Sequence, residues 1–386
     1  MSDLYKGFAQ KGQEKELIRF LDRVFTRINF RTVPYFMSLL PKLYKTCYDP
    51  CANNLVIRDE KGFRAAVGLY MLDYRCGDSK LLAGGIGNVA VDKKFRGYGY
   101  MKELMNDVFA VCKERNADFM VLGGLRHRYN YFGYERVGQV FEYRVTKTNL
   151  RHALRGVTAD GYSLRRVTEK DSELLAQIKT LREGQTIHVP CKDDALFDTM
   201  RSWLAKPYAV MDGEKLAGYF IINKLGTKIS ELCMFDNHQL PAAVTAIFQQ
   251  FMRPVIKFEI APAQTMSNEF FRRLCEVAEI KSTDSYLILN FRNTLQVLME
   301  NSGTRLIDGE LIVGIKGFAG DENLRISVEN RRVSVTQTQG PPEYTLEHLV
   351  ATRVFFDAVC PERDLLPPPA QAWFPLALYF PHADMV

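Results

Sequence analysis

The pattern of apolar and polar positions along the first 145 residues changes its period several times, and each change predicts an element. Apolar positions at helical spacing indicate helices, and short runs rich in β-branched residues indicate strands. The expected elements are, in order, helices within 14–48, strands at 55–58, 63–74 and 84–91, an amphipathic helix from Met101, and strands at 119–122 and 137–145. The first part is therefore predicted to be a domain of mixed helices and strands.

The most informative part of this pattern runs from Gly84 to Tyr134. An uncharged strand is followed by a turn that holds Lys93, Lys94 and Arg96 and two glycines, and then by a helix. Glycines let backbone N–H groups approach a phosphate closely, and a helix N-terminus carries partial positive charge. The turn is therefore a candidate anion site, although an ordinary turn with solvated lysines has the same local pattern.

The rest of the chain divides into two further parts. Periodicity lapses near 148–161, and a second series of strands and helices then repeats the order of the first without a Gly-rich basic turn. We therefore expect a related fold that lacks the ligand site. A third part starts near Asn290, has a helix that breaks at Ser302-Gly303, and ends in an apolar tail from Trp373 to Val386. Such a tail needs a place to be buried.

Composition narrows the classes of protein that fit. The 386 residues suffice for two or three domains, and 47% hydrophobic and 25% charged residues are ordinary for globular proteins. A formal net charge of +6 favours anionic ligands but gives no basic stripe for nucleic acid. No apolar run approaches the roughly 20 residues of a membrane span, and the polar N-terminus lacks a signal-peptide core. We expect a soluble cytoplasmic protein.

Eight cysteines are scattered along the chain, and none forms a Cys-x-x-Cys pair. Cys47 and Cys51 are four residues apart, but no second pair and no histidine lies at zinc spacing. Reduced structural thiols, and no metal site, are therefore expected.

Three motifs together resemble the GNAT acyltransferases. They are Val89-Ala-Val91, the turn Arg96-Gly-Tyr-Gly99, and the corner Tyr129-Asn-Tyr-Phe-Gly-Tyr134. In that family an Arg/Gln-x-x-Gly-x-Gly/Ala turn holds the pyrophosphate of acetyl-CoA, and here Met101 takes the last small position. The three-part layout further resembles the Eis-like (enhanced intracellular survival) acetyltransferases.

This resemblance implies the overall organisation. The fold class would be α+β, with tandem GNAT acyltransferase folds followed by a sterol-carrier-protein-like α/β domain. The implied domains are a catalytic GNAT domain at 1–150, a degenerate GNAT-like domain at 151–288, and a sterol-carrier-like domain at 289–386 whose tail enters the active site. The family also implies a homo-oligomer, a hexamer.

Carried over residue by residue, the resemblance implies a site that uses acetyl-CoA as co-substrate and no metal. Tyr129 would be the acid and the C-terminal carboxylate of Val386 the base. The implied acetyl-CoA-binding residues are Val89, Ala90, Val91, Arg96, Gly97, Tyr98, Gly99, Tyr100, Met101, Lys102, Gly124 and Leu125.

The residues themselves leave the base open. The strand Gly84 to Val91 contains no carboxylate and no histidine, and Asp92 lies at its end, toward the expected phosphates. The alternatives to the Val386 carboxylate are a water chain that acts as the base, or a tail that only completes an interface. His127 could act as acid or base, but a lone histidine in a polar corner is more often structural or solvated.

The predicted function is an acetyl-CoA-dependent N-acetyltransferase that acts on amine groups of small polycationic molecules such as aminoglycosides, by direct transfer in a ternary complex. Transfer from a thioester to an amine requires orientation, removal of a proton from the ammonium group, and return of one to the thiolate. The alternatives are a lipid- or ligand-binding protein with degenerate acetyltransferase domains and a protein-lysine acetyltransferase.

Overall fold

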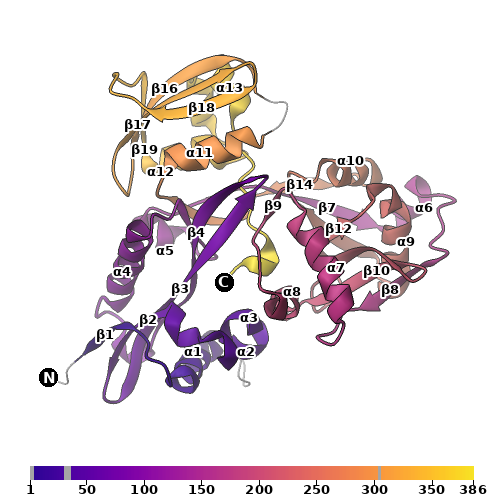
Figure 1. Cartoon of the computed structure of the whole chain (residues 1–386), viewed down its shortest axis with the longest axis horizontal. Coiled ribbons are helices and arrows are strands. Elements are labelled where there is room, and N and C mark those ends of the chain that lie inside the picture. The colour runs from indigo at the N-terminus through magenta and orange to yellow at the C-terminus, as the bar shows by residue number, and fades with distance from the viewer. Residues whose placement is uncertain (1–3, 30–35, 303–305) are drawn as a thin grey trace. The chain divides into compact units, whose positions relative to one another are not determined.

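A computed structural model describes residues 4–29, 36–302 and 306–386. The chain forms two compact units. Unit 1 comprises residues 1–138, 284–378 and 385–386, and unit 2 comprises residues 139–283 and 379–384. Apart from the two-residue strand β9 (Ile187–His188), the strands of the described residues form three sheets, of which the first and third lie in unit 1 and the second in unit 2 (Figure 1).

The first sheet contains the long hairpin that carries the candidate site. Its strands, in spatial order, are β1 (Tyr5–Phe8), β2 (Asn54–Asp59), β3 (Gly62–Cys76), β4 (Ser79–Val91), β5 (Phe119–Leu122), β15 (Asp284–Ile288) and β6 (Glu135–Val137). The β4 and β5 strands run parallel, and the other neighbours along this order are antiparallel.

The helix after the glycine-rich turn packs on this sheet. Leu104, Met105 and Val108 of α4 (Tyr100–Glu114) are buried against Val67 and Leu69 of β3 in one hydrophobic cluster. Their spacing of three and four residues puts them on one face of the helix. The other helices of the N-terminal part are α1 (Glu14–Asn29), α2 (Phe36–Leu39), α3 (Pro41–Tyr44) and α5 (Arg126–Tyr129).

Unit 2 is a sheet covered on both faces. Its strands, in spatial order, are β14 (Ala278–Lys281), β7 (Val140–Thr146), β13 (Val255–Ile260), β12 (Lys228–Met234), β11 (Lys215–Ile222), β10 (Lys206–Asp212) and β8 (Tyr162–Arg166). Its helices are α6 (Lys147–Ala153), α7 (Ser172–Glu183), α8 (Leu196–Met200), α9 (Leu240–Phe251) and α10 (Thr265–Leu274), and a short strand, β9 (Ile187–His188), follows α7.

Alternate side chains of β11 pack into two different hydrophobic clusters of unit 2. Phe220 and Ile222 pack in the cluster that contains α9 and α10, whereas Tyr219 and Ile221 pack in the cluster that contains α7 and α8. Successive side chains of a strand point to opposite faces, so each face receives every second residue.

The third sheet consists of β18 (Arg332–Gln337), β17 (Glu322–Glu329), β16 (Gly309–Lys316) and β19 (Tyr344–Glu347), in that spatial order. Helix α11 (Phe291–Glu300) contacts β18, α12 (His348–Phe356) contacts β19, and α13 (Pro368–Trp373) contacts β16. Figure 1 shows these elements together, in orange and yellow.

Two strands pair outside the part of the sequence in which they were expected. β7 ends before residue 150, yet it pairs with β13 and β14 in the second sheet. β15 ends at Ile288, yet it lies between β5 and β6 in the first sheet. The three-domain division at 150 and 288 stays a proposal, and the sheets exchange one strand in each direction across those boundaries.

Most expected elements are present at nearly their expected positions, including the strand at 84–91 and the helix from Met101. The strand expected at 137–145 is instead two strands, β6 and β7, that belong to different sheets. Helix α6 occupies the start of the segment where periodicity lapses, and Thr146 and Asn149 cap it reciprocally. The predictions on residues 30–35 and the break at Gly303 lie outside the described residues.

None of the helices in the described part of the chain is long and apolar enough to cross a membrane.

A buried carboxylate joins the corner of the first sheet to α12. Glu135 accepts hydrogen bonds from Arg126 at 2.6 and 2.8 Å and from Arg353 at 3.0 Å. Burial raises the pKa of Glu135, but bonds from Arg126, the Arg136 amide and Arg353 outweigh burial and leave this pKa below its ordinary value.

We expect Glu135→Gln to lower the free energy of unfolding by about 1–3 kcal/mol at neutral pH, because charged hydrogen bonds are lost. Since the folded pKa lies below the unfolded value, the contribution is present above about pH 4.5 and disappears as the pH falls through the folded pKa. Urea unfolding of both proteins across this range measures the difference. A difference that does not shrink in acid would contradict this origin.

Candidate active site

The centre of the candidate site is a bulge in β4. Ala66 pairs with Ala90 and Gly68 pairs with Gly87, so one residue of β3 opposes two residues of β4. Asn88, one of these two, has φ of 39°, in the left-handed region that asparagine tolerates better than most residues. A bulge of this kind bends the strand and frees backbone groups from the ladder.

The side chain of Asn88 fixes this bulge. Its Nδ2 donates to Asn54 Oδ1 at 2.8 Å, and its Oδ1 accepts a hydrogen bond from the Tyr44 hydroxyl. Asn54 is fully buried and donates in turn to the carbonyl of Pro50 at 2.7 Å. A polar network whose members are satisfied in this way holds one backbone conformation.

Next to the bulge, the parallel strands β4 and β5 part. The last paired residues of the two strands are Gly85 and Val121, while β4 continues to Val91. Beyond Gly85, β4 therefore has an edge that β5 does not cover. Backbone N–H groups there can meet a carbonyl oxygen of a ligand, in the manner of an oxyanion hole.

The glycine-rich turn follows directly. Gly97 and Gly99 have φ of 88° and 83°, and among the described residues no heavy atom, apart from those of each glycine and its two neighbours in the chain, would lie within 4 Å of a Cβ at either position. The turn therefore needs glycine for its backbone shape and leaves open space above it. Gly99 is the N-cap of α4, whose free N–H groups point toward the turn.

Positive charge surrounds this turn. Lys93, Lys94, Arg96 and Lys102 are exposed. Within residues 4–29, 36–302 and 306–386, no ion pair with a carboxylate is formed by any of these four, and Lys102 lies 5.1 Å from the ring centre of Tyr131. Unpaired cations beside a helix N-terminus suit a phosphate group.

Tyr129 lies at the end of α5, on the other side of the parting strands. It is 6% exposed, its ring meets Tyr134 edge to face, and a Cβ at Gly124 would lie 2.3 Å from its Cε2 atom. Burial raises the pKa of Tyr129, which the nearby Arg128 only partly offsets. The hydroxyl therefore stays protonated at neutral pH and is available as a donor.

The end of the chain lies against β4. A Cβ added to Gly87 would be 3.3 Å from the carboxyl carbon of Val386, and one added to Gly85 would be 2.8 Å from Val386 Cγ2. Val386 is 8% exposed and Met385 is 4% exposed. The terminus thus occupies a slot that only glycines on β4 leave free, directly before the Asn88 bulge.

The structure therefore brings the residues expected from sequence into one region of unit 1. Val89, Ala90 and Val91 end β4, and Arg96 to Lys102 form the turn and the first turn of α4. Gly124 and Leu125 link β5 to α5, whose last residue is Tyr129. Val386, from the other end of the chain, joins them on β4.

Two other sequence candidates have different surroundings. Asp92 accepts from the Lys94 amide at 3.0 Å and pairs with Arg23 at 3.2 Å, so its carboxylate is occupied in holding the turn. His127 is exposed on α5. Neither residue is at the uncovered edge of β4.

The second sheet contains a comparable opening. The parallel strands β12 and β13 pair at Lys228 and Ile229, and a cavity of about 270 Å³ lies beyond, lined among others by Glu231, Gln264 and Tyr379. The segment after β12, Phe235-Asp-Asn-His-Gln-Leu240, lacks the glycines and cations of the first turn. This agrees with the expectation of a related fold without that ligand turn.

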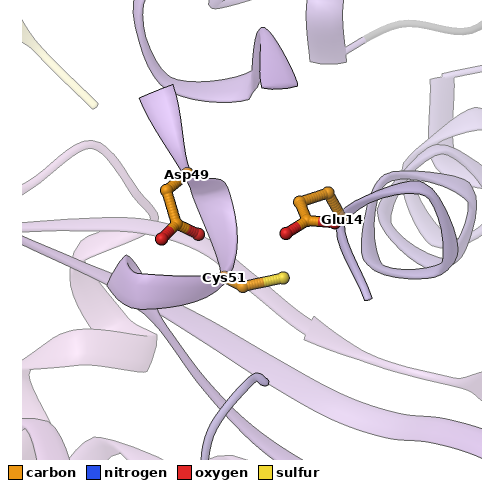
Figure 2. Close-up of side chains that lie close together, drawn as sticks. All are labelled: Glu14, Asp49 and Cys51. Atoms are coloured by element: carbon orange, nitrogen blue, oxygen red, sulfur yellow. The ribbon is translucent and has the colours of Figure 1, made fainter. Parts of the chain in front are cut away.

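A group of potential metal ligands lies apart from this region. Donor atoms of Glu14, Asp49 and Cys51 lie within 4.8 Å of one another (Figure 2). Glu14 accepts from the Gly12 amide at 2.8 Å and Asp49 accepts from the Ala52 amide at 3.3 Å. Burial and the two carboxylates raise the pKa of Cys51 to about 11, which keeps the thiol protonated. These groups therefore have structural roles already.

Sequence reasoning missed the network that sets the bulge. Asn88 is the single polar side chain in the run Gly84 to Val91, which was the available signal. Asn54 and Tyr44 are 34 and 44 residues away along the chain, so no local pattern connects them with it.

Comparison with known families gives one match. Residues 8–137 match the model described as an acetyltransferase (GNAT) domain. Comparison with curated protein sequences gives no match.

Solved structures are similar along the whole chain. A GCN5-related N-acetyltransferase from Anabaena variabilis ATCC 29413 has a TM-score of 0.67 at 16% identity, with 98% of each chain covered. A conserved protein from Enterococcus faecalis V583, described as a probable N-acyltransferase, has 0.68 at 17%, covering 97% of this chain and 95% of that one. Eis1 from Mycobacterium abscessus has 0.67 at 13%, with 98% of each covered. At these identities the likeness is one of fold.

Proposed function

Since residues 8–137 form an acetyltransferase domain of the GNAT family, we propose that this chain transfers the acetyl group of acetyl-CoA to an amine by direct attack in a ternary complex. The observation that carries the mechanism is the approach of the Val386 carboxyl group to Gly87, beside the uncovered edge of β4. That edge is where the thioester would be held.

In this proposal acetyl-CoA binds along the glycine-rich turn and between the parted strands β4 and β5. The pyrophosphate is held by N–H groups of Gly97 to Lys102 together with the Arg96 guanidinium. The pantetheine arm runs between the parted strands, along Val89 to Val91 on one side and Gly124 and Leu125 on the other. The backbone of β4 at the bulge polarises the thioester carbonyl.

The proton transfers are assigned to the carboxylate of Val386 and the hydroxyl of Tyr129. The carboxylate of Val386 removes a proton from the acceptor ammonium group, and the amine nitrogen then attacks the thioester carbon. As the C–S bond breaks, Tyr129 donates its proton to the departing thiolate, which leaves as the thiol, and the second proton that the nitrogen loses on becoming an amide returns to the Tyr129 phenolate. The carboxylate supplies the base that the strand Gly84 to Val91 lacks in its own sequence.

Calorimetric titration with acetyl-CoA, followed by measurement of thiol release with a panel of amines, tests the proposal. We expect binding at micromolar acetyl-CoA and thiol release that depends on the amine. A chain that fails to bind acetyl-CoA at that concentration would not be this enzyme, and the lipid-binding alternative would then take its place.

Arg96→Ala is expected to weaken acetyl-CoA binding by about 10- to 100-fold, because one charge-assisted contact to phosphate is lost. The loss should shrink at high salt, since exposed charges are screened. Arg115→Ala is a matched control, because Arg115 is exposed at the other end of the 15-residue α4. Equal losses in both variants would indicate a general charge effect.

The acceptor class proposed is a small polycationic amine of the aminoglycoside type, with a protein lysine as the second candidate. The proposal includes the three domains and the sixfold assembly that the resemblance implies.

One observation argues against the lipid-binding alternative: helix α13 covers strand β16 in the third sheet. Trp373 is 1% exposed, and its indole N–H donates to the Ile307 carbonyl at 2.8 Å.

A further inference from the structure

The bulge on β4 is tied to a strand that is not its direct neighbour. Asn54 of β2 pairs with Gly68 of β3, and Gly68 pairs with Gly87 of β4. The side-chain amide of Asn88 crosses β3 at Gly68 and donates to Asn54 at 2.8 Å. A Cβ at Gly68 would collide with Asn88 Oδ1, so this position needs glycine. Strand β3 therefore leaves a passage for the Asn88 side chain.

The two amide groups of this network are oriented by their partners. Asn54 Nδ2 donates to the Pro50 carbonyl at 2.7 Å, so Asn54 Oδ1 is left to face Asn88. Asn88 presents Nδ2 to that oxygen, and its own Oδ1 accepts from the Tyr44 hydroxyl. Exchanging Nδ2 and Oδ1 of Asn88 would place two amide oxygens against each other. Both sides of the Asn88 side chain are thus specified by buried residues.

Tyr44, the last residue of α3, is itself held in place. It is 0% exposed, and its ring meets the ring of Phe36 edge to face, with 4.9 Å between ring centres and 75° between planes. Burial raises the pKa of Tyr44 well above its ordinary value, so the hydroxyl stays protonated at neutral pH. Tyr44 therefore brings a neutral hydrogen-bond donor to a fixed point beside the bulge.

The backbone at Asn88 depends on such support. Its φ of 39° is unfavourable for a residue with a side chain, and such a conformation persists where surrounding contacts impose it. A bulge turns the local peptide groups away from the regular ladder. These groups lie beyond Gly85, on the part of β4 that β5 does not cover. The conformation of this one residue therefore sets the direction of the backbone groups that are proposed to meet the thioester.

We infer that Tyr44 is a positioning residue of the enzyme: its hydroxyl holds Asn88 in the left-handed conformation and so aims the backbone N–H groups of the bulge at the thioester carbonyl. The inference rests on the proposed function, in which this edge of β4 polarises that carbonyl. Donors that are already aimed at the developing oxyanion lower the barrier to reaction. Phosphate binding is assigned to the separate turn from Arg96 to Lys102, so Tyr44 acts on kcat rather than on affinity.

Tyr44→Phe deletes the hydroxyl and keeps the ring that packs on Phe36. We expect kcat to fall by about 10- to 100-fold, with the Kd for acetyl-CoA changed by less than about twofold. A direct readout is the C=O stretching frequency of acetyl-CoA labelled with carbon-13 at the acetyl carbonyl. Binding to the unmodified protein should lower this frequency, because aimed N–H donors weaken the C=O bond, and Tyr44→Phe should lose most of that shift. An unchanged shift in the variant would overturn the positioning role, whatever happens to kcat.

Tyr143→Phe is a matched control for the loss of a buried hydroxyl. Tyr143 is 3% exposed, and its hydroxyl donates to Asn268 Oδ1 at 3.1 Å in unit 2. The same atom and the same kind of hydrogen bond are therefore lost outside the bulge network. Thermal unfolding midpoints are measured for both variants, and kcat and the carbonyl frequency should change only in Tyr44→Phe. Equal changes in both would indicate general destabilisation and contradict the inference.

A double-variant cycle tests whether Tyr44 acts through Asn88. Asn88→Gly removes the side chain and leaves a residue that tolerates positive φ. In that background Tyr44→Phe should cause no further fall in kcat, because the hydrogen bond is already absent. A further fall of about 10- to 100-fold would exclude this route and, with it, the positioning role.

The same measurements on the unmodified protein test the proposed function separately. Acetyl-CoA that binds without any change in its carbonyl frequency would refute polarisation by β4, and the role of Tyr44 with it. Failure to bind acetyl-CoA at all would refute the enzyme itself. A normal frequency shift in the unmodified protein that Tyr44→Phe leaves intact would refute the positioning role alone.

Discussion

Converting the carboxylate of Val386 to a carboxamide is expected to lower turnover by about 10²- to 10⁴-fold, the range that a general base contributes. The amide is close in size to the carboxylate but cannot accept the ammonium proton. Packing against Gly85 and Gly87 is therefore retained while the chemistry is lost. Acetyl-CoA affinity should not change, because the turn from Arg96 to Lys102 is untouched.

Peptide ligation supplies the carboxamide and, as its matched control, the same product with a free carboxylate. Both carry the ligation scar, so only the terminal group differs. Turnover is read as thiol release and affinity by titration. If the amide turns over as fast as the acid, a water chain is the base and the terminus is a packing element.

Tyr129→Phe is expected to have the second large effect, about 10²- to 10⁴-fold on kcat with little change in acetyl-CoA affinity. The substitution deletes one hydroxyl and keeps the ring that packs against Gly124 and Tyr134. Because burial raises the pKa of Tyr129, its protonated form persists through neutral and mildly alkaline pH. Loss of activity from its ionisation should therefore occur only above about pH 10.

Tyr134→Phe provides the control from the same corner. Tyr134 is 1% exposed, and its hydroxyl contacts Met120 Sδ at 3.8 Å. It loses the same atom at a position that the proposed chemistry does not use. A comparable loss of kcat in both variants would show that the corner needs hydroxyl groups for its structure. An unchanged kcat in Tyr129→Phe would remove it as the acid.

The sequence was informative wherever the determining interactions are local. The alternation and spacing of apolar residues predicted strand β4 and helix α4, and the match over residues 8–137 confirms the prediction of a GNAT acetyltransferase domain there and of an acetyl-transfer enzyme. The prediction of an α+β chain with tandem folds of this type is also confirmed, since GCN5-related N-acetyltransferase folds cover nearly the whole chain. Glycines in a turn and periodic apolar residues predict the structure of the segment in which they lie.

Non-local pairings were not available from the sequence. Strand propensity places β7 and β15 on the chain but does not say which sheet each one joins. The ion pair between Arg182 and Asp384 joins residues that are 202 positions apart, and no local pattern connects them. The left-handed Asn88 likewise depends on distant partners, Asn54 and Tyr44.

The position of β15 has a consequence for the order in which this protein is made. The acetyltransferase domain matches residues 8–137, but its sheet lacks the strand between β5 and β6 until residues 284–288 have left the ribosome. We therefore expect the edges of β5 and β6 to remain unpaired in the nascent domain while nearly 150 further residues are synthesised. The residue proposed to carry the base, Val386, is synthesised later still.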